Sequence, residues 1–310
     1  MRPPPPAALP LLFALAAPAP AAAAPLADVH LHYTWNQTAT SPEAAVAALE
    51  AQGVVLAVVM GTPPELALAL RRAGGRWVVP FFSPYLTPAM RHTWFRHPEV
   101  LDAARRALEG GRYFGLGEIH LVAGLGPVTR RRHPVVDGLL ALAVAFDVPI
   151  LIHTEASSHR HLLPLCRRHP RARILWAHAG GILPPAEVDA LLAACANVWV
   201  DLAARDPERY VENPIAGRSG RLRPGWRALL EKYPSRFMVG SDPVWPVDER
   251  DRWDRDDTGW QRLDRYLGFH RRWLAALPKS LAARVGLHNA LAFLRVGRDP
   301  RIALREDEED

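Results

Sequence analysis

Six histidine and acidic residues are spaced along the chain in a way that suits the binding of a divalent metal ion. Two of them, His30 and His32, are separated by one leucine in the segment DVHLH. Because side chains alternate along a strand, both imidazoles would point to the same side and could share one ion. The other candidates lie far from this pair in the sequence: Glu118, His153, His178 and Asp242.

The types of these residues indicate the chemistry. Neutral imidazoles and carboxylates are ligands that suit Zn²⁺, Mn²⁺ and Fe²⁺. Such an ion lowers the pKa of a bound water to about 7, so the water becomes a nucleophile at neutral pH. A carboxylate beside the ion can take the proton from this water and pass it to the leaving group. We assign that role to Asp242, and we expect one or two divalent ions per chain, zinc before manganese or iron.

Short apolar runs alternate with longer amphipathic segments after residue 24. Near-continuous apolar runs are typical of parallel strands that are covered on both faces. We expect strands at 26–32, 54–60, 76–82, 113–119, 149–154, 173–178, 197–202 and 236–241. Apolar residues at three- and four-residue spacing predict helices in segments that include 42–52, 99–109, 134–146, 157–169, 185–196 and 224–233.

Eight strands alternating with helices predict an α/β fold, a closed (β/α)8 barrel of the TIM type, in a single domain over residues 25–303. Active-site residues of this fold lie at the C-terminal ends of the strands. All six candidate ligands stand at or just after such an end. A single histidine there is commonly a hydrogen-bonded structural residue, so the prediction of a metal site depends on their joint register. We expect 242–258 to be a long loop over the mouth of the barrel.

Several motifs resemble those of the amidohydrolase superfamily, specifically its amidohydrolase-related (amidohydrolase 2 type) TIM-barrel metal-dependent hydrolases. The motifs are DVHLH at 28–32, His153 at the end of the fifth strand, HAGG at 178–181, GSD at 240–242 and Asn289 in HNALAFL. The resemblance extends over essentially the whole chain after the first two dozen residues. It implies a hydrolase that uses a metal-activated water on a small polar substrate, such as an amide, a lactone or a related ester.

The resemblance leaves the number of ions open. Superfamily members that bridge two ions with a carbamylated lysine need a lysine at a strand end, but Lys232 and Lys279, the only lysines, fall in expected helices. A single ion is slightly favoured, which would leave His178 free to polarise the substrate or to stabilise an oxyanion. Its ligands would be His30, His32, Asp242 and either His153 or Glu118. In a two-ion site Glu118 would be the bridge, with His30, His32 and Asp242 on one ion and His153 and His178 on the other.

Four further residues could contact the substrate or orient the ligands. His120 shares a strand face with Glu118, and Asp201 ends the seventh expected strand. Trp245 falls in the loop after the eighth strand, and Asn289 lies in the late HNALAFL segment. For His120, a role in orienting Glu118 is as good an explanation as contact with the substrate, and the other three could equally be structural residues.

Three other functions stay open. A metal-dependent decarboxylase would use the same ligands on a carboxylated substrate, and only substrate tests distinguish it. A TatD-like nuclease is suggested by the GEI motif at 117–119 and the pI of about 9.8, although His120 directly after this motif departs from the TatD pattern. In a different class, a degenerate barrel could bind a small molecule without turnover, but an acid kept beside two imidazoles argues against it.

The composition is typical of an ordinary globular chain with a sizeable core, because hydrophobic residues make up 49% and charged residues 23% of the sequence. The formal charge of +6 comes almost wholly from arginines that are scattered along the chain. We therefore expect a small-molecule substrate and no nucleic-acid groove. The sequence is compatible with a homo-oligomer.

The N-terminal segment predicts export. Residues 1–24 combine Arg2, an apolar run and an Ala-rich stretch, which is the pattern of a secretory signal peptide. We expect a secreted or periplasmic protein without a membrane anchor, because no run approaches the roughly 20 apolar residues of a spanning helix. Residues 304–310 should form an acidic disordered tail. Cys166 and Cys195 fall in helices that could be neighbours, and two buried thiols are favoured over a disulfide.

Overall fold

The computed structural model describes residues 24–37, 39–122, 133–154, 158–209, 212–244 and 256–306. Its eight strands are parallel and follow one another in the expected order. They are β1 (Leu26–Thr34), β2 (Val54–Thr62), β3 (Val78–Phe81), β4 (Leu116–Val122), β5 (Ile150–Thr154), β6 (Ile174–Trp176), β7 (Val198–Asp201) and β8 (Phe237–Met238).

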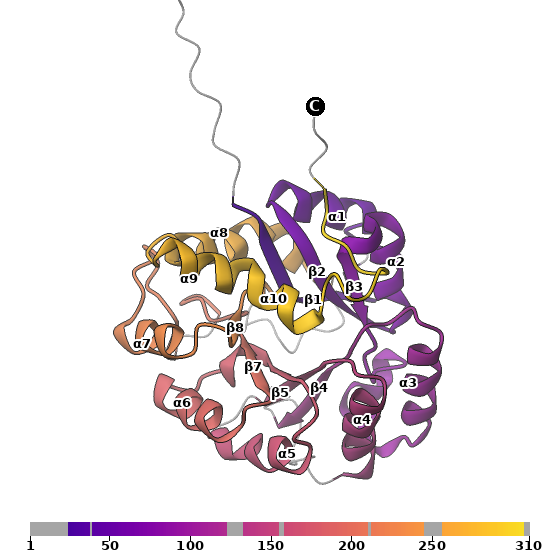
Figure 1. Ribbon diagram of the computed structural model, residues 1–310. Coiled ribbons are helices and arrows are strands. Elements are labelled where there is room, and N and C mark those ends of the chain that lie inside the picture. Colours follow the sequence, from indigo (N-terminus) through magenta and orange to yellow (C-terminus); the bar gives the residue numbers. More distant parts are fainter. Residues whose placement is uncertain are drawn as a thin grey trace, which may run out of the picture.

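The strands close into one barrel. β1 to β3 and β4 to β8 form two parallel series in which neighbours in space are neighbours in sequence. Phe82, directly after β3, pairs in parallel with Leu116 of β4. At the other seam, Val29 of β1 donates a hydrogen bond to the carbonyl of Val239, directly after β8, at 3.0 Å. The chain therefore folds as the expected TIM barrel, with its helices around the strands (Figure 1).

The helices of the described residues follow the predicted amphipathic segments. Ser41 begins the first of them, because its side chain accepts a hydrogen bond from the N–H of Ala44 at 3.2 Å and Pro42 takes the first helical position. They are α1 (Pro42–Ala51), α2 (Glu65–Gly74), α3 (Glu99–Glu109), α4 (Pro134–Ala145), α5 (Leu163–Arg168), α6 (Pro185–Ala194), α7 (Pro224–Lys232), α8 (Leu263–Leu274), α9 (Lys279–Ala283) and α10 (Asn289–Leu294).

Element boundaries differ from the predicted ones where 3-10 turns intervene. Gly75–Trp77 form such a turn, so β3 begins at Val78 and not at residue 76. Arg71 stabilises the turn, because its guanidinium donates to the carbonyls of Arg76 at 2.8 Å and of Val78 at 2.6 Å. The helix expected at 157–169 is likewise divided into a 3-10 turn, His159–His161, and the shorter α5.

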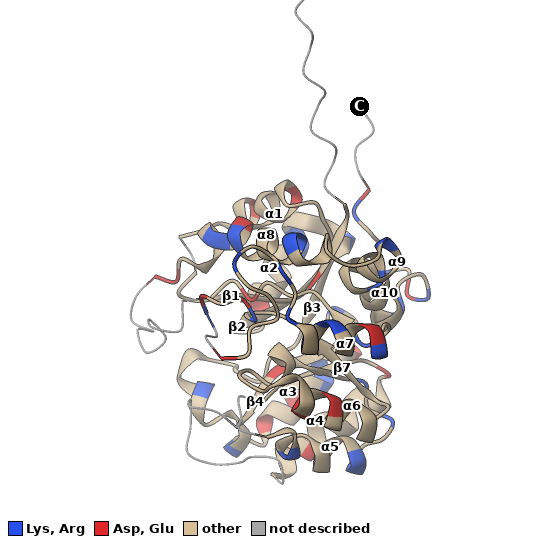
Figure 2. Cartoon of the chain, turned by 90° about the vertical axis from the view of Figure 1, so that its left-hand side faces the viewer, with Lys and Arg blue, Asp and Glu red and all other residues tan. Residues whose placement is uncertain are grey.

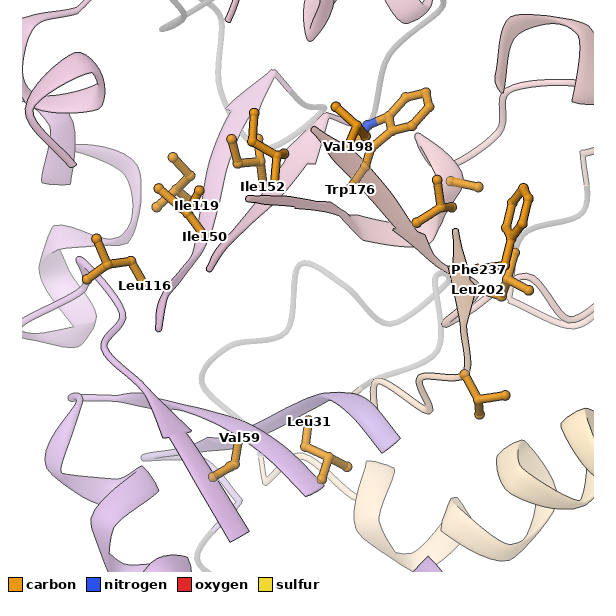
Figure 3. Close-up of a cluster of buried hydrophobic side chains, with 14 of the residues drawn as sticks. Leu31, Val59, Leu116, Ile119, Ile150, Ile152, Trp176, Val198, Leu202 and Phe237 are labelled. Atoms are coloured by element: carbon orange, nitrogen blue, oxygen red, sulfur yellow. The ribbon is translucent and has the colours of Figure 1, made fainter. Parts of the chain in front are cut away.

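Apolar side chains cover both faces of the strands. One buried set packs between the strands and the helices, and Ile152 and Trp176 of this set lie on the outer side of the ring of strands in Figure 3. A second set, on the opposite face, includes Leu175 and, from α10, Phe293. Because side chains alternate along a strand, His153 points to the opposite side from Ile152, toward the inside of the barrel.

A disulfide joins two of the outer helices. Cys166 of α5 is bonded to Cys195, directly after α6, with an S–S distance of 1.92 Å and a Cα–Cα distance of 6.1 Å. The two helices follow the adjacent strands β5 and β6, which brings the cysteines within the range of a disulfide. The expectation of two separate thiols is therefore wrong.

Two features of the chain's surface and ends bear on the predictions. Of the helices that the structure describes, none has the length and apolar character needed to cross a membrane. Lys and Arg are distributed over several elements in Figure 2, in agreement with the expected scatter of positive charge. Residues 1–23, 245–255 and 307–310 are not among the described residues, so most of the predicted signal peptide, mouth loop and acidic tail lies outside them.

Candidate metal centre

The predicted ligands converge at the C-terminal mouth of the barrel. β1 brings His30 and His32, whose Nε2 atoms lie 3.2 Å apart. Glu118, which lies within β4, places its Oε2 atom 3.1 Å from Nε2 of His32 and 3.5 Å from Nε2 of His30. Asp242, shortly after β8, places its Oδ1 atom 3.7 Å and 3.9 Å from the same two nitrogens. Two imidazoles and two carboxylates therefore face one point.

A second group of ligands adjoins the first. Nδ1 of His153 lies 2.9 Å from Oε1 of Glu118, and Nε2 of His178 lies 3.6 Å from the same oxygen. Nε2 of His178 is also 3.8 Å from Oδ2 of Asp242. Glu118 and Asp242 therefore each direct one oxygen to the histidines of β1. The other oxygen of Glu118 faces His153 and His178, and the other oxygen of Asp242 faces His178.

The donor set fits a divalent cation. Oδ1 of Asp242 is buried and accepts no hydrogen bond from any described residue, which is costly for a carboxylate unless a cation or water completes its environment. The facing Nε2 atoms of His30 and His32 can both direct lone pairs at one cation. Three sets of ligand atoms have all members within 4.8 Å of one another, namely His30, His32 and Glu118; His30, His178 and Asp242; and Glu118, His153 and His178.

Asp201, the last residue of β7, orients two of the histidines. Its Oδ2 atom lies 3.1 Å from Nδ1 of His30, and its Oδ1 atom accepts a hydrogen bond from the backbone N–H of His178 at 3.1 Å. Nδ1 of His178 lies 3.1 Å from the carbonyl oxygen of Ala203. Because a carbonyl only accepts, Nδ1 of His178 carries the proton and Nε2 presents its lone pair to the centre. The Asp201 carboxylate fixes His30 in the same way.

The charges of the centre depend on one another. Burial alone would raise the pKa of Glu118, but neighbouring histidines, His30 first and then His120 and His153, hold it well below its usual range. Burial alone would lower the pKa of His30, but Asp201 and the two facing carboxylates hold it well above its usual range. Glu118 of the metal-free centre therefore stays anionic while His30 retains a proton, which a bound cation would displace.

The HAGG and GSD motifs have a steric explanation. His178 and Asp242 both adopt the left-handed backbone conformation, with φ of 55° and 48°. Gly180 follows with φ of 76°, and a Cβ there would lie 2.3 Å from an aromatic ring of β6. A Cβ on Gly240 would lie 2.7 Å from Cβ of His30. Glycines at these two positions therefore let the turn after β6 and the strand end of β8 come close enough to present the two ligands.

His120 lies beside the centre and is held by a tyrosine. Its Nε2 atom is 3.5 Å from Oε2 of Glu118, while its Nδ1 atom pairs with the hydroxyl of Tyr85. The same hydroxyl accepts the backbone N–H of His120 at 3.1 Å. Burial lowers the pKa of His120 well below its usual range, so the ring is neutral. None of the sequence motifs includes Tyr85. The sequence signal that could have indicated a role in the site is its position shortly after β3.

One of the remaining predicted residues, Asn289, lies away from the centre. Asn289 donates to the carbonyls of Pro234 at 2.9 Å and Phe237 at 2.8 Å, at the start of β8. Asp242 follows the other end of that strand, so the side chain of Asn289 lies away from the ligands and braces the entry to β8. Trp245 lies outside the described residues.

A family model described as Amidohydrolase matches residues 5–296 of the sequence. The chain belongs to the amidohydrolase family. Members of this family are generally metal-dependent, in keeping with the cluster of histidines and carboxylates at the mouth of the barrel. This amidohydrolase is therefore an enzyme of the hydrolase class.

Solved structures share the barrel of this amidohydrolase at low sequence identity. A probable 2-pyrone-4,6-dicarboxylic acid hydrolase from Acinetobacter baumannii, with citric acid bound, is 11% identical, with a TM-score of 0.53 over 87% of this chain and 99% of that one. An amidohydrolase from Burkholderia multivorans with bound zinc is 19% identical, with a TM-score of 0.54 over 88% and 99%. A 5-methylcytosine deaminase from Klebsiella pneumoniae, liganded with 5-fluorocytosine, is 14% identical, with a TM-score of 0.55 over 88% and 75%. No curated protein matches the sequence.

Proposed function

We propose that this amidohydrolase binds two divalent ions, zinc in preference, and hydrolyses a C–N or C–O bond of a small polar substrate such as an amide, a lactone or a related ester. The position of Glu118 carries the proposal. Its Oε2 atom lies 3.1 Å from Nε2 of His32, and its Oε1 atom lies 2.9 Å from Nδ1 of His153. A carboxylate whose two oxygens face separate histidines has the arrangement of a bridging ligand, which supports two ions over the single ion that the sequence slightly favours.

The ligands divide into two sets. No lysine can replace Glu118 as the bridge, because Lys232 and Lys279 lie in the outer helices α7 and α9. His178, which a single-ion site would leave free for catalysis, becomes a ligand in this assignment. One ion would be held by His30, His32, Asp242 and Oε2 of Glu118, and the other by His153, His178 and Oε1 of Glu118.

The chain's own residues supply the proton transfers. When bound, the ions would lower the pKa of a water and polarise the substrate carbonyl. Asp242 is the base, because its Oδ1 atom is buried at the centre and accepts no hydrogen bond from the described residues. It takes a proton from the attacking water, whose oxygen forms the new bond to carbon, and gives that proton to the leaving nitrogen or oxygen. Asp201 holds Nδ1 of His30 and the Ala203 carbonyl holds Nδ1 of His178, so that Nε2 of each ring faces the centre.

Two alternatives use the same centre. Decarboxylation of a carboxylated substrate needs the same ligands, so it is distinguished only by its product. A TatD-like nuclease has weaker support, because the Lys and Arg residues that the structure describes are dispersed over several elements in Figure 2.

A substrate screen tests the hydrolase directly. The zinc-loaded protein would be assayed with lactones, N-acyl amino acids and simple esters, with CO2 release recorded in parallel. We expect hydrolysis of at least one class and a loss of about 10²- to 10⁴-fold in Asp242→Asn, because the base is removed. Asp189→Asn is the matched control, since Asp189 pairs with Lys232 on the surface at 2.7 Å. CO2 release in place of hydrolysis, or full activity in Asp242→Asn, would overturn the proposal.

We also propose that the protein is exported through its N-terminal segment. The Cys166–Cys195 disulfide supports this, because disulfides persist mainly in oxidising compartments outside the cytoplasm. N-terminal sequencing after cell fractionation is the test. A chain that begins near residue 25 in the periplasm or medium is expected, and an intact N-terminus retained in the cytoplasm would refute the proposal.

A further inference from the structure

Two buried arginines lie four positions apart in the segment that follows β7. Arg205 is fully buried and Arg209 is 5% exposed. Nε of Arg205 donates to the carbonyl oxygen of His178 at 2.7 Å, and Nη1 of Arg209 donates to the carbonyl oxygen of Asp242 at 2.7 Å. The segment after β7 therefore binds the main chain of two candidate ligands, His178 through Arg205 and Asp242 through Arg209.

Arg205 binds most of the turn that carries His178. Its Nη2 atom donates to the carbonyls of Ala179 and Leu183, both at 2.8 Å, so one guanidinium bonds three carbonyls of this turn. The planar group also lies 4.7 Å from the ring centroid of Trp226. Because the guanidinium is rigid and its donors are fixed in direction, these bonds determine how the peptide planes of the turn are rotated.

Contacts with Asp206 and Tyr266 hold the side chain of Arg209 in place beside Asp242. Its Nε atom donates to Oδ2 of Asp206 at 2.6 Å, and its guanidinium lies 3.6 Å from the ring centroid of Tyr266. Oδ1 of Asp206 accepts the backbone N–H groups of Glu208 and Arg209, both at 3.1 Å. These contacts fix the orientation of the Arg209 guanidinium, so that its Nη1 atom donates to the carbonyl oxygen of Asp242.

The two carbonyls belong to residues whose backbone needs support. His178 and Asp242 are left-handed, with φ of 55° and 48°, a conformation that L-residues adopt at a cost. Each carbonyl also accepts a short-range backbone hydrogen bond, from Gly181 N–H to His178 at 3.1 Å and from Val244 N–H to Asp242 at 2.8 Å. Rotation of either peptide plane would swing the attached imidazole or carboxylate away from the centre.

We propose that Arg205 and Arg209 are positioning residues that hold the left-handed turns of His178 and Asp242 so that both side chains meet the metal ions. The inference rests on the proposed metal centre for its functional consequence. Neither arginine is a metal ligand or a substrate contact in this assignment, since Arg205 donates to main-chain carbonyls and Arg209 donates to the Asp206 carboxylate and the Asp242 carbonyl. Each arginine acts on its own turn, so the two effects are separable.

The test compares Arg205→Met and Arg209→Met with Arg236→Met. Arg236 is a matched control, because it also donates to main-chain carbonyls, those of Val198 and Cys195, and lies over an aromatic ring, but it precedes β8 at the opposite end of the barrel. Arg205→Lys and Arg209→Lys keep the positive charge but lack the planar guanidinium with its several N–H donors. They replace the methionine variants if those do not fold.

Two readouts separate positioning from general stability. In the metal-free protein, amide exchange should become at least about 10-fold faster at Gly181 in the Arg205 variants and at Val244 in the Arg209 variants, relative to amides of the barrel strands. Zinc affinity, measured by chelator competition, should fall about 10- to 100-fold in both, with a smaller loss in the lysine variants. Arg236→Met should change neither readout at these positions.

The outcomes distinguish the two proposals. Exchange at Gly181 and Val244 that matches Arg236→Met would overturn the positioning role whatever the metal content. Faster local exchange with unchanged zinc affinity would also overturn it, because the turns would then move without consequence for the centre. A wild-type chain that binds no zinc would refute the metal centre, and the exchange data would still show whether the arginines hold the turns.

Discussion

The carboxylate of Asp201 lies 3.1 Å from Nδ1 of His30, on the side of the ring that faces away from the candidate centre. This contact turns Nε2 of His30 toward Glu118 and Asp242. The same carboxylate accepts the backbone N–H of His178. One buried acid at the end of β7 therefore orients a ligand from β1 and supports the turn of another.

Replacing that acid should weaken metal binding without removing a ligand. In Asp201→Asn the amide can no longer offer two anionic oxygens, so the tautomer and rotation of His30 are less well fixed. We expect zinc affinity to fall about 10- to 100-fold, measured by chelator competition. Asp189→Asn on the surface is the control, and equal affinity in the two variants would contradict the orienting role.

Tyr85 should matter for turnover more than for metal content. Tyr85→Phe removes the hydroxyl that pairs with Nδ1 and with the backbone N–H of His120, so the imidazole ring loses its fixed position beside Glu118. We expect about two bound metal ions as in the wild type, a stability loss of about 1 kcal/mol, and a several-fold drop in kcat. Tyr33→Phe is matched, because it also loses one hydroxyl hydrogen bond, to Thr40 at 2.7 Å. Equal kcat values in the two variants would count against the assignment.

His270 should make the protein sensitive to mild acid. Burial, followed by the charge of Arg209, lowers the pKa of this histidine from its ordinary value of 6.5 to about 4. A depressed pKa means that folding excludes the proton, so the contribution to stability is present above pH 6.5 and is lost as the pH falls toward 4. The difference amounts to about 3 kcal/mol.

The measurement is the free energy of unfolding of the metal-free protein against pH. His270→Gln should lose less stability than the wild type between pH 6.5 and 4. His169→Gln, at a surface ion pair with Asp137, should follow the wild type. Parallel curves for His270→Gln and the wild type over this range would show that the buried imidazole is not the cause.

The disulfide should stabilise the chain without affecting the centre. It closes a loop with a sequence separation of 29, which corresponds to about 3.5 kcal/mol from the restricted unfolded chain. We expect Cys166→Ala/Cys195→Ala to unfold at a lower temperature with unchanged zinc affinity. Reductant should lower the wild-type transition to the same point and leave the variant unaffected. An unshifted transition in the variant would disprove the contribution.

The barrel and most of the metal ligands could be predicted because their signals are local. Strands such as β2 and β6 are buried throughout and mostly apolar, since both faces are covered, and the ligands lie within or just after the strands. Tyr85, Arg205 and Arg209 could not be found in this way, because each acts through a contact with a distant segment, and a scattered arginine has no periodicity that marks it as buried. The preference for two ions likewise depends on which way each oxygen of Glu118 points, which no sequence pattern encodes.

Elemental analysis of protein purified without chelators tests the central claim most directly. We predict about two equivalents of zinc per wild-type chain, with one lost in His30→Ala/His32→Ala and the other in His153→Ala/His178→Ala. His97→Ala, which removes a surface histidine paired with Glu99, should keep both. One equivalent that persists in Glu118→Gln would contradict the bridging carboxylate, and no bound metal after reconstitution with zinc would contradict the metal centre itself.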